Sequence, residues 1–348
     1  MKKALIVGAT GFGGLGLIEI LLRHPGIEIK QLVARKDVGV PVSAVFPHLR
    51  GFCDMVVDAP ERIDFANVDI AFFSTPDRAG MTMINDFRDK GIPVIDFSGD
   101  FRFRSTDEYG VYARNKGMAD GHLAADVIGE AVYGLPEMYA DEIRNAKIVG
   151  NPGCFAICMI LGLLPAVAGG IVDASTIVCD GKTGVSGAGK NPGEANFYPQ
   201  RYENVNTYRE GRHQHLVEVE NILNREGSSP VKVFFVPQIV PLNRGIMITA
   251  YAPAKAGINT AKAASLYRDY YMGKPFVLIT DTSPATTDVR GSNRCEIRPM
   301  VDERTGTLFV TAVIDNLVKG QSGNAVQNAN LMLGFDETMG LNVPAFYP

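Results

Sequence analysis

Short apolar runs rich in β-branched residues recur along the first half of the chain, and most intervals between them leave room for a helix. We expect strands at residues 4–7, 31–34, 68–74, 93–98 and 147–149. Between the first two runs, the apolar residues of Leu15–His24 recur on one helical face. Buried strands that alternate with helices are typical of a parallel sheet covered on both faces. The first half is therefore predicted to be an α/β domain.

The pattern changes after Gly150, where the strand-like runs become longer and lie closer together. We expect strands at residues 176–179, 231–236, 246–252, 276–280, 295–301 and 308–314, and helices at about 155–167, 213–226, 259–272 and 323–333. Turn sequences at 241–245 and 302–306 join neighbouring runs, which favours antiparallel pairing. The second half is predicted to be an α+β domain with a mixed, mainly antiparallel sheet.

Length and composition narrow the class of protein. A chain of 348 residues is long enough for two domains that each bury a core. Its 34 basic and 38 acidic residues argue against a nucleic-acid partner, and no apolar run reaches the roughly 18 residues of a membrane span. The five scattered cysteines form no CxxC pair, which favours reduced thiols over a disulfide framework or zinc site. We expect a cytoplasmic protein that binds neither nucleic acid nor a membrane.

A glycine-rich turn lies between the first strand and the first helix. The apolar stretch at 4–7 runs directly into it, so we interpret that stretch as a strand rather than as part of a signal peptide. Gly8, Gly11 and Gly14 form a GxxGxxG variant of the dinucleotide fingerprint. Glycine allows the backbone to turn tightly and to approach a pyrophosphate, whose charge the helix N-terminus stabilises. The sequence predicts a Rossmann-type nucleotide-binding domain, with a plain structural turn as the alternative.

Two cations follow the second strand, where a dinucleotide site contacts the adenosine ribose. Arg35 and Lys36 stand where NAD sites usually carry Asp or Glu for the ribose 2′-hydroxyl. Cationic side chains there favour a 2′-phosphate instead. The sequence therefore predicts NADP(H) as the cofactor, and a pair of solvated surface charges is the alternative.

Cys154 is the strongest candidate for a nucleophile. It follows Asn151-Pro152-Gly153 directly after the strand at 147–149, and an apolar helix begins behind it. Backbone N–H groups and the helix dipole at such a turn stabilise a thiolate. Cys158, one helical turn later, is expected in the core, because a buried cysteine packs as a small hydrophobic side chain.

A thiolate nucleophile requires a proton-transfer partner. His213 and His215 occur together, and Glu218 could orient the His215 imidazole if a helix begins there. The spacing leaves open which of the two histidines exchanges the proton. No third ligand follows at a suggestive spacing, so no metal site is expected.

A second glycine-rich stretch, Asp180–Lys190, ends a predicted strand. Its lysines, hydroxyls and N–H groups suit an anion such as phosphate, and a flexible structural loop is the alternative. The sequence lacks the GxxxxGK[ST] order of a Walker loop.

Several of these segments together resemble the N-acetyl-gamma-glutamyl-phosphate reductase family, within the semialdehyde dehydrogenase superfamily. The resemblance covers nearly the whole chain, and GNPGC, DNLVKG and AVQN in this order are its most specific combination. The matching segments are GATGFGG at 8–14, SGDFR at 98–102, YGLPE at 133–137, GNPGC at 150–154, Gly184–Gly189, the HxH motif with Glu218, PLNRGI at 241–246, DNLVKG at 315–320 and AVQN at 325–328.

The resemblance implies NADPH-dependent reduction of an acyl phosphate to an aldehyde in arginine biosynthesis. Cys154 would displace phosphate to give a thioester, and hydride from NADPH would convert the thioester to a thiohemiacetal. His213 or His215 would act as the base in the collapse to the aldehyde. The resemblance also implies a homodimer or homotetramer formed through the second domain.

Binding residues and domain limits follow from the same resemblance. Those expected beside the cofactor are Gly8, Thr10, Gly11, Phe12, Gly13, Gly14, Arg35, Lys36, Ser74, Gly184, Ser186, Gly187, Asn316, Lys319 and Gly320. Those expected to bind the substrate are Arg102, Asn151, Tyr208, Arg209 and Arg244, and guanidinium forks suit its carboxylates and phosphate.

The final helix would return to the first domain. That return implies a nucleotide-binding domain of residues 1–150 completed by 318–348, and a catalytic and oligomerisation domain of residues 151–317.

The chain departs from the family pattern at three places. Phe155-Ala156-Ile157 replaces a common Tyr-Pro-Thr, Gly13 replaces a frequent Thr, and HxHxPE has become HQHLVE. None of these changes removes a group that the mechanism needs, although Phe155 lies next to the nucleophile and could affect substrate choice.

Three other functions compete with this interpretation. The first is reduction of another acyl phosphate, such as aspartyl phosphate or a carrier-protein-linked lysine precursor, which the DNLVKG and AVQN segments disfavour. The second is a non-catalytic NADP-binding regulator, which would not need the cysteine and histidines that are present. The third is a cysteine acyltransferase or hydrolase, which would not need the dinucleotide fingerprint.

Overall fold

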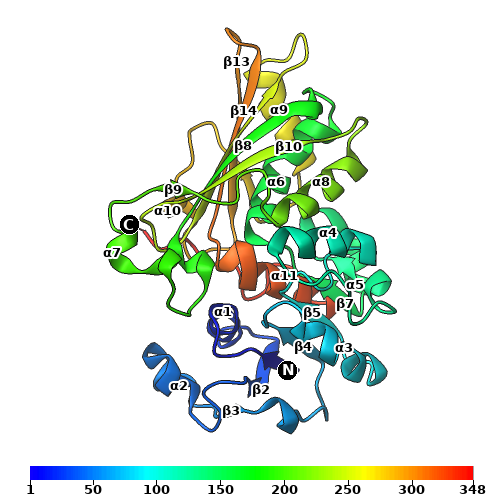
Figure 1. The fold of residues 1–348 in the computed structure, drawn as a ribbon, viewed down its shortest axis with the longest axis vertical. Coiled ribbons are helices and arrows are strands. Elements are labelled where there is room, and N and C mark those ends of the chain that lie inside the picture. Colours follow the sequence, from blue (N-terminus) through cyan, green and yellow to red (C-terminus); the bar gives the residue numbers. More distant parts are fainter. Residues whose placement is uncertain (348) are drawn as a thin grey trace. The chain divides into compact units, whose positions relative to one another are not determined.

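The computed structural model describes residues 1–347 and divides them into two compact units (Figure 1). The first unit comprises Met1–Val111, Ala119–Pro152 and Gln321–Val343. The second comprises Tyr112–Met118, Gly153–Gly320 and the residues from Pro344 onward. The sheets of the two units confirm the predicted fold class, which is an α/β part followed by an α+β part.

The first unit is built on a seven-stranded sheet in which every described pair of strands is parallel. The order β3-β2-β1-β4-β5-β7-β6 places β1 at Lys2–Val7, β2 at Ile27–Val33, β3 at Val57–Asp58, β4 at Ile70–Phe73, β5 at Val94–Asp96, β6 at Val132–Tyr133 and β7 at Ile148–Gly150. All four residues of β4 are buried. A strand that is apolar on both faces requires helices on both sides of the sheet.

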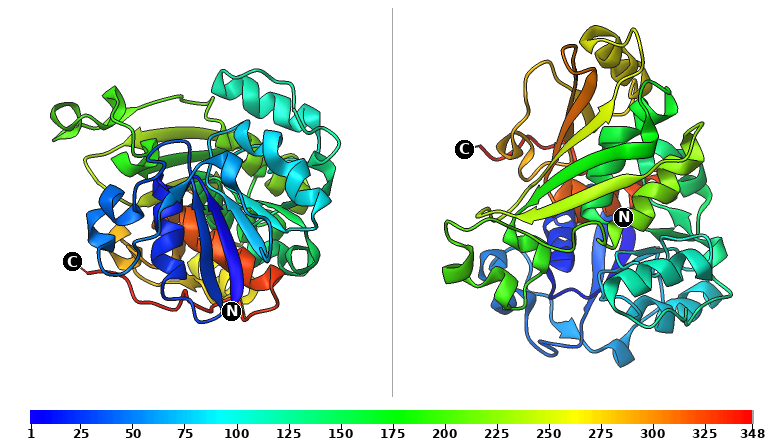
Figure 2. Two further views of the ribbon diagram at one scale, coloured as in Figure 1. Left: turned by 90° about the horizontal axis from the view of Figure 1, so that it is seen from below. Right: turned by 45° about the horizontal axis from the view of Figure 1, so that its top comes forward.

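The helices of this unit come from both ends of the chain. They are α1 (Phe12–Leu21), α2 (Val42–Val45), α3 (Ala79–Asp89), the first part of α4 (Thr106–Lys116), α5 (Pro136–Asn145) and α11 (Gly323–Met332). The C-terminal α11 packs against α1 and α5, and the left view of Figure 2 shows it in orange beside the blue N-terminal segments. Because the strands are parallel, the loops that follow β1, β4, β5 and β7 share one edge of the sheet.

The second unit is built on a mixed seven-stranded sheet of order β12-β13-β14-β11-β8-β10-β9. Its strands are β8 (Ile177–Thr183), β9 (Asn206–Thr207), β10 (Val233–Ile239), β11 (Ile246–Pro253), β12 (Val277–Ile279), β13 (Cys295–Asp302) and β14 (Thr307–Ile314). The pairs β8–β10 and β12–β13 are parallel, and the remaining described pairs are antiparallel. The prediction of a mixed, mainly antiparallel sheet is confirmed.

One face of this sheet is covered by helices. They are α6 (Cys154–Ala168), α8 (His215–Glu226) and α9 (Thr260–Tyr270), and α6 packs against both other helices and against β11 and β14. Figure 1 shows α6 and α8 on the same side of β8 and β10. The unit also contains the short helices α7 (Tyr198–Arg201) and α10 (Thr286–Val289), and a π-helical turn, Val318–Ser322, precedes α11.

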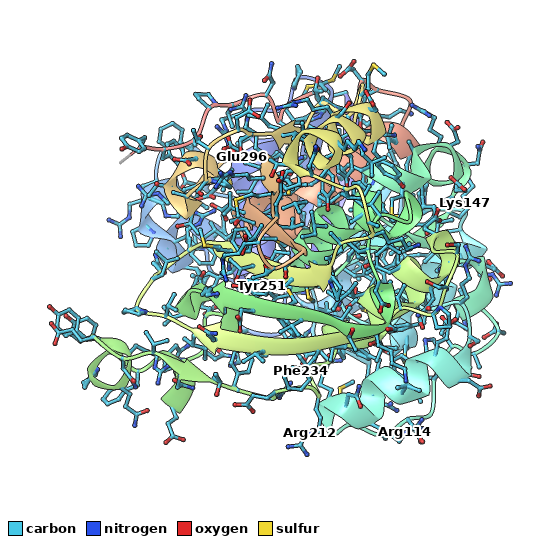
Figure 3. All side chains as sticks on the ribbon, turned by 90° about the horizontal axis from the view of Figure 1, so that it is seen from above. Arg114, Lys147, Arg212, Phe234, Tyr251 and Glu296 are labelled. Atoms are coloured by element: carbon cyan, nitrogen blue, oxygen red, sulfur yellow. The ribbon has the colours of Figure 1, made fainter. Side chains whose placement is uncertain are left out.

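The opposite face carries a cross-strand row of apolar side chains. Phe234 of β10 is paired in register with Val178 of β8, Val178 with Tyr251 of β11, and Tyr251 with Phe309 of β14. Side chains of paired residues lie on the same face of a sheet. Phe234 is 58% exposed and Val178 41% exposed, and Figure 3 labels Phe234 and Tyr251. We call Val178, Phe234, Tyr251 and Phe309 the outer apolar row.

Some element boundaries differ from the sequence prediction. The helix expected from Leu15 to His24 begins earlier, at Phe12, and ends at Leu21, while His24 bonds Asn330 through its Nε2 (2.9 Å). Strand β8 continues to Thr183, because its pairing with β10 and β11 extends that far. The two-residue strands β3, β6 and β9 are too short to leave a periodic pattern. Among residues 1–347, no helix is long and apolar enough to cross a bilayer.

Candidate active site

Cys154 is the first residue of α6, and the tight turn before it brings the chain directly out of β7. Its N-cap residue, Gly153, provides no side chain to cap the helix, and the first turn contains no acidic residue. The N-terminal N–H groups of α6 are therefore available to favour a thiolate. Cys154 is half-buried, whereas Cys53, Cys158, Cys179 and Cys295 are buried, and none of the five forms a disulfide. Burial raises the pKa of the Cys158 thiol, as expected for a core residue.

Glu218 connects the nucleophile turn to α8. This helix begins at His215, so His215 and Glu218 are separated by three residues and lie on one face. Glu218 is buried, and its Oε2 accepts a hydrogen bond from the backbone N–H of Gly153 (3.0 Å). Its Oε1 lies 4.0 Å from His215 Nε2. One carboxylate therefore holds the turn before Cys154 and faces the imidazole.

The His215 ring packs directly on Gly153. A Cβ atom added to Gly153 would lie 2.3 Å from His215 Nε2 and 2.5 Å from its Cδ2. No side chain can therefore stand at the residue before the nucleophile while His215 keeps this position. The contact places an imidazole nitrogen beside the backbone that carries Cys154, where a proton-transfer group is needed.

His213 has a different environment from His215. It is buried among aromatic rings, with centroids 5.7 Å from Phe155, 5.6 Å from Tyr208 and 5.4 Å from Phe235. Its Nδ1 accepts the backbone N–H of His215 (3.3 Å). Burial, and to a smaller extent the neighbouring His215, lowers the pKa of His213 to about 2. His213 is therefore neutral at physiological pH and orients the backbone of His215.

Phe155 and Tyr208 flank this histidine from two elements. Phe155 is buried and meets Phe235 as well (5.1 Å), so its ring points into the core of the second unit. Phe155, which stands where the family commonly has Tyr, therefore contributes to the packing around His213. Tyr208 follows β9, and burial, followed by the proximity of Cys154, raises the pKa of its hydroxyl.

The DNLVKG segment lies against the nucleophile within the second unit. A Cβ added to Gly320 would lie 2.9 Å from Cys154 Cβ. Lys319 is fully buried, with its Nζ 5.9 Å from the Phe276 ring. Asn316 is also buried, and its Oδ1 accepts from Gly245 N (2.7 Å).

The glycine-rich stretch after β8 is connected to the same segment. Its Ser186 lies in a 3₁₀ turn, Val185–Ala188, that also contains Gly187 and follows Gly184. The Ser186 hydroxyl donates to Asn243 O (2.6 Å) and accepts from Asn316 Nδ2 (3.0 Å). Gly184, Ser186, Gly187 and Asn316 thus take part in a cluster of loops at the ends of β8 and β14 and the start of β11.

The residues expected to bind substrate are spread over both units. In the first, Arg102 Nε donates to Asn151 O (2.8 Å), and Asn151 Oδ1 accepts from Asn324 (2.8 Å) and Asn328 (3.2 Å) of α11. In the second, Arg244 Nη2 contacts Asp315 (3.1 Å). Arg209 is exposed, has φ +50°, and donates to Gln214 Oε1 (2.8 Å).

The first unit has a backbone cradle that fits a dinucleotide phosphate. Gly8 has φ +89°, and a Cβ there would lie 2.1 Å from Ser74 O, whereas a Cβ on Gly14 would lie 2.4 Å from Gly8 O. Gly11 is the N-cap of α1, and only Gly8 O lies within 4 Å of a Cβ placed there. Thr10, Phe12 and Gly13 complete the turn, and no acidic residue stands in the first turn of α1. These N–H groups suit a pyrophosphate.

The charge beyond β2 fits a phosphate on the adenosine ribose. Arg35 and Lys36 are both exposed directly after this strand. The neighbouring Asp58, at the end of β3, accepts a hydrogen bond from Gln31 Nε2 (2.8 Å). The residues at this edge therefore provide two cations for a 2′-phosphate.

The sequence analysis missed two sets of residues that shape the site. Asp315 anchors the DNLVKG turn, and Asn324 and Asn328 fix the amide of Asn151. Asp315 and Asn328 lie inside the DNLVKG and AVQN segments, and Asn324 directly precedes AVQN. A polar residue directly after a buried strand was the available signal for Asp315. Among residues 1–347, no group of three or more His, Cys, Asp and Glu side chains could hold a metal ion.

Two family models match successive parts of the chain. A family model described as "Semialdehyde dehydrogenase, NAD binding domain" matches residues 3–146. A second, "Semialdehyde dehydrogenase, dimerisation domain", matches residues 154–316. Aspartate semialdehyde dehydrogenase II from Vibrio cholerae, solved in complex with ASA, has a TM-score of 0.71 at 20% identity, and the match covers 96% of this chain and 98% of that one. The enzyme from Candida albicans, solved with NADP, has a TM-score of 0.68 at 17% identity, over the same shares of the two chains.

Curated relatives are more similar. The N-acetyl-gamma-glutamyl-phosphate reductase of Geobacter sp. (strain M21) is 40% identical over 352 residues, with all of both chains covered. That of Thermoanaerobacter sp. (strain X514) is 41% identical over 355 residues, again with complete coverage. The chain therefore belongs to the semialdehyde dehydrogenase family, in the branch of the N-acetyl-gamma-glutamyl-phosphate reductases.

Proposed function

We propose that this protein reduces N-acetyl-gamma-glutamyl phosphate to N-acetylglutamate semialdehyde and phosphate, with NADPH, in arginine biosynthesis. The observation that carries the proposal is the contact of His215 with Gly153 beside Cys154, in a chain about 40% identical to reductases of that name. A cysteine with an adjacent imidazole at a helix N-terminus suits acyl transfer through a thioester.

The first unit would bind NADPH, and the second would carry the chemistry. The pyrophosphate would contact the N–H groups of Gly8–Gly14, and Arg35 and Lys36 would contact the 2′-phosphate. Ser74 closes the cradle at Gly8, and Gly184, Ser186, Gly187, Asn316, Lys319 and Gly320 are proposed contacts from the second unit. Bound NADPH supplies the hydride that reduction of a thioester requires.

Acyl transfer begins at the Cys154 sulfur. The thiolate attacks the acyl carbon, a C–S bond forms, and the C–O bond to phosphate breaks with phosphate as the leaving group. The result is a thioester on Cys154. Gly153 leaves space for His215, and the Glu218 carboxylate keeps the turn fixed during this step.

His215 is the proposed acid and base. Its Nε2 would protonate the oxygen that becomes negative when the thioester carbonyl is reduced, and would remove that proton as the C–S bond breaks. The aldehyde then leaves and the Cys154 thiolate is restored. His213 stays neutral throughout, because burial keeps its pKa far below the working pH.

Substrate anions require cations and N–H donors. Arg102, Asn151, Tyr208, Arg209 and Arg244 are the proposed set. Arg244 is the best supported of these, because its side chain is 28% exposed while its Nη2 meets Asp315. The guanidinium is therefore held in place and still accessible to a substrate carboxylate.

The reverse reaction provides the test. NADP⁺ reduction is followed with phosphate and either N-acetylglutamate semialdehyde or aspartate semialdehyde. Phosphate-dependent reduction with the acetylated aldehyde alone supports the proposal. A preference for aspartate semialdehyde would move the protein to another substrate within the family, and no reaction with either aldehyde would overturn the proposal.

We also propose a cytoplasmic homodimer, or a homotetramer of two such dimers, formed through the outer apolar row. The family model over this unit is that of a dimerisation domain, and the row exposes apolar side chains on the adjacent strands β10, β8 and β11, with Phe309 of β14 half-buried beside them. Phe234→Glu should yield monomers in light-scattering measurements, whereas Phe197→Glu, at another exposed aromatic residue outside the row, should not. Unchanged assembly of Phe234→Glu would contradict this interface.

The cytoplasmic location is supported by cysteines that form no disulfide.

A further inference from the structure

Asp315 is a buried carboxylate at the end of β14 that makes several hydrogen bonds to backbone N–H groups. Its Oδ1 accepts from Leu317 N (2.8 Å) and Val318 N (3.2 Å). Its Oδ2 accepts from Gly291 N (2.6 Å). Asp315 is fully buried, so these donors replace the water that an ionised carboxylate would otherwise require.

Arg244 balances the charge of this carboxylate. Its Nη2 lies 3.2 Å from Oδ1 and 3.1 Å from Oδ2 of Asp315. Breaking a buried pair by removing one partner leaves an uncompensated charge, so each side chain depends on the other. The pair joins the turn before β11 to the segment that follows β14.

The segment fixed in this way ends at Cys154. The backbone N–H of Gly320 donates to Asp315 O (2.9 Å), which closes the turn from 315 to 320. Gly320 then lies against the nucleophile: an added Cβ would be 2.9 Å from Cys154 Cβ and 3.4 Å from Cys154 Cα. The hydrogen bonds of Asp315 therefore fix the position of Gly320, which packs against Cys154.

We infer that the Arg244–Asp315 pair positions the Cys154 thiol, by fixing the turn whose Gly320 packs against it. Asp315 and Arg244 act here as positioning residues, through Gly320. This inference rests on the proposed function only for the role of Cys154 as the nucleophile. It adds a second task to Arg244, whose Nη2 holds the turn while the exposed part of the side chain remains for a substrate anion.

Alkylation of Cys154 by iodoacetamide tests the inference without substrate or cofactor. Intact-mass measurement follows one alkylation, because the other four cysteines are buried. In Asp315→Asn, we expect the pH midpoint of the alkylation rate to rise by about half a unit, because a displaced thiolate loses contact with the α6 N-terminus. In the reductase assay, kcat should fall about 10–100-fold with KM changed less than about 3-fold, since a misplaced nucleophile affects mainly the chemical step.

A second variant and a matched control separate positioning from general stability. Gly320→Ala leaves Asp315 intact but disturbs the same contact, and should shift the alkylation profile in the same direction. If Asp315→Asn fails to fold, Arg244→Gln removes the same ion pair and takes its place in the alkylation measurement, which involves no substrate. Thr260→Val removes two other hydrogen bonds of this unit, to Val301 O and N, and should lower Tm without changing alkylation.

The outcomes are distinct. If a folded Asp315→Asn or Gly320→Ala variant alkylates Cys154 with the wild-type rate and pH midpoint, the positioning role is overturned. If wild-type protein reduces no acyl phosphate but the alkylation shifts occur, the proposed reaction fails and the positioning of Cys154 stands. If Thr260→Val shifts alkylation equally, the effect reports stability, and the inference is rejected.

Discussion

Helices α1 and α6 have similar N-termini, but different residues surround them. Each follows a parallel strand, each has an extended glycine as its N-cap, and neither has a capping side chain or an acidic residue in its first turn. At α1, a Cβ on the N-cap glycine would meet only Gly8 O, at 3.6 Å. At α6, a Cβ on the equivalent Gly153 would run into the His215 ring. Both helices present N–H groups at their N-termini, but α6 adds a thiol and an adjacent imidazole.

The difference lies in what surrounds each turn. The α1 turn packs Gly8 against Ser74 O, and the Ser322 hydroxyl donates to Gly13 O (3.2 Å), so no carboxylate of residues 1–347 holds it, which suits a ligand bound by N–H groups. The α6 turn is held by the buried carboxylate of Glu218 on Gly153 N. A helix N-terminus therefore provides the electrostatic field, and residues distant in sequence decide whether it binds a phosphate or activates a nucleophile.

The largest effect is expected from removal of the thiol. Cys154→Ala should lower kcat by at least about 10⁴-fold, because the covalent step has no other nucleophile. NADPH affinity, measured by fluorescence titration, should stay nearly unchanged, since the proposed cradle lies at α1. Loss of folding or of NADPH binding in this variant would mean that the thiol is structural.

The two histidines should respond unequally. His215→Asn should lower kcat by about 10²–10⁴-fold, as removal of a general acid or base does. His213→Asn should lower kcat only about 10-fold, because its ring holds the His215 backbone and does not exchange the proton. Steady-state kinetics across pH compare the two variants. A larger loss in His213→Asn would reverse the assignment.

The two N-cap glycines form a matched pair. Gly153→Ala should lower kcat about 10²-fold, because the new methyl group displaces His215. Gly11→Ala makes only an ordinary contact with Gly8 O, at 3.6 Å, in a conformation that alanine tolerates, so the fold and Tm should persist while NADPH affinity falls. Titration and kinetics on both variants provide the comparison. Equal loss of NADPH affinity in both would remove the functional distinction between α1 and α6.

Arg35→Ala should weaken NADPH binding by about 10–100-fold and leave NADH binding nearly unchanged, because a charge-assisted hydrogen bond to the 2′-phosphate contributes about 1.5–3 kcal/mol. Arg50→Ala, at another exposed arginine of the same unit, is the control and should change neither. Equal weakening of both nucleotides by Arg35→Ala would argue against recognition of the 2′-phosphate.

The smallest expected effect is on how the free energy of unfolding depends on pH. The pKa of His213 falls from its ordinary 6.5 to about 2 on folding, so the unfolded chain binds more protons below about pH 6.5. Stability is then highest above this pH, and His213 should remove about 2 kcal/mol from the free energy of unfolding by about pH 5. Urea unfolding of wild type and His213→Asn measures the difference. Parallel pH dependences would show that His213 does not titrate in this way.

Local patterns predicted most of the architecture. The longer strands of both sheets, the glycine turn at Gly8 and the cysteine at the start of α6 depend on neighbouring residues in the chain, so periodicity and turn residues reveal them. The boundaries of α1 and β8 depended on partners elsewhere, and were misplaced for that reason.

The arrangement of the site depended on tertiary contacts. The sequence did not distinguish the roles of His213 and His215. In the fold, burial among Phe155, Tyr208 and Phe235 keeps the His213 imidazole uncharged. Likewise, the position of Asp315 after a strand did not reveal its partners, and the fold brings it to Arg244 and places Gly320 on Cys154. Sequence determines which chemical groups exist and the local conformation around them. Desolvation, charge pairing and steric contact depend on distances between segments far apart in the chain, and only the folded protein sets those distances.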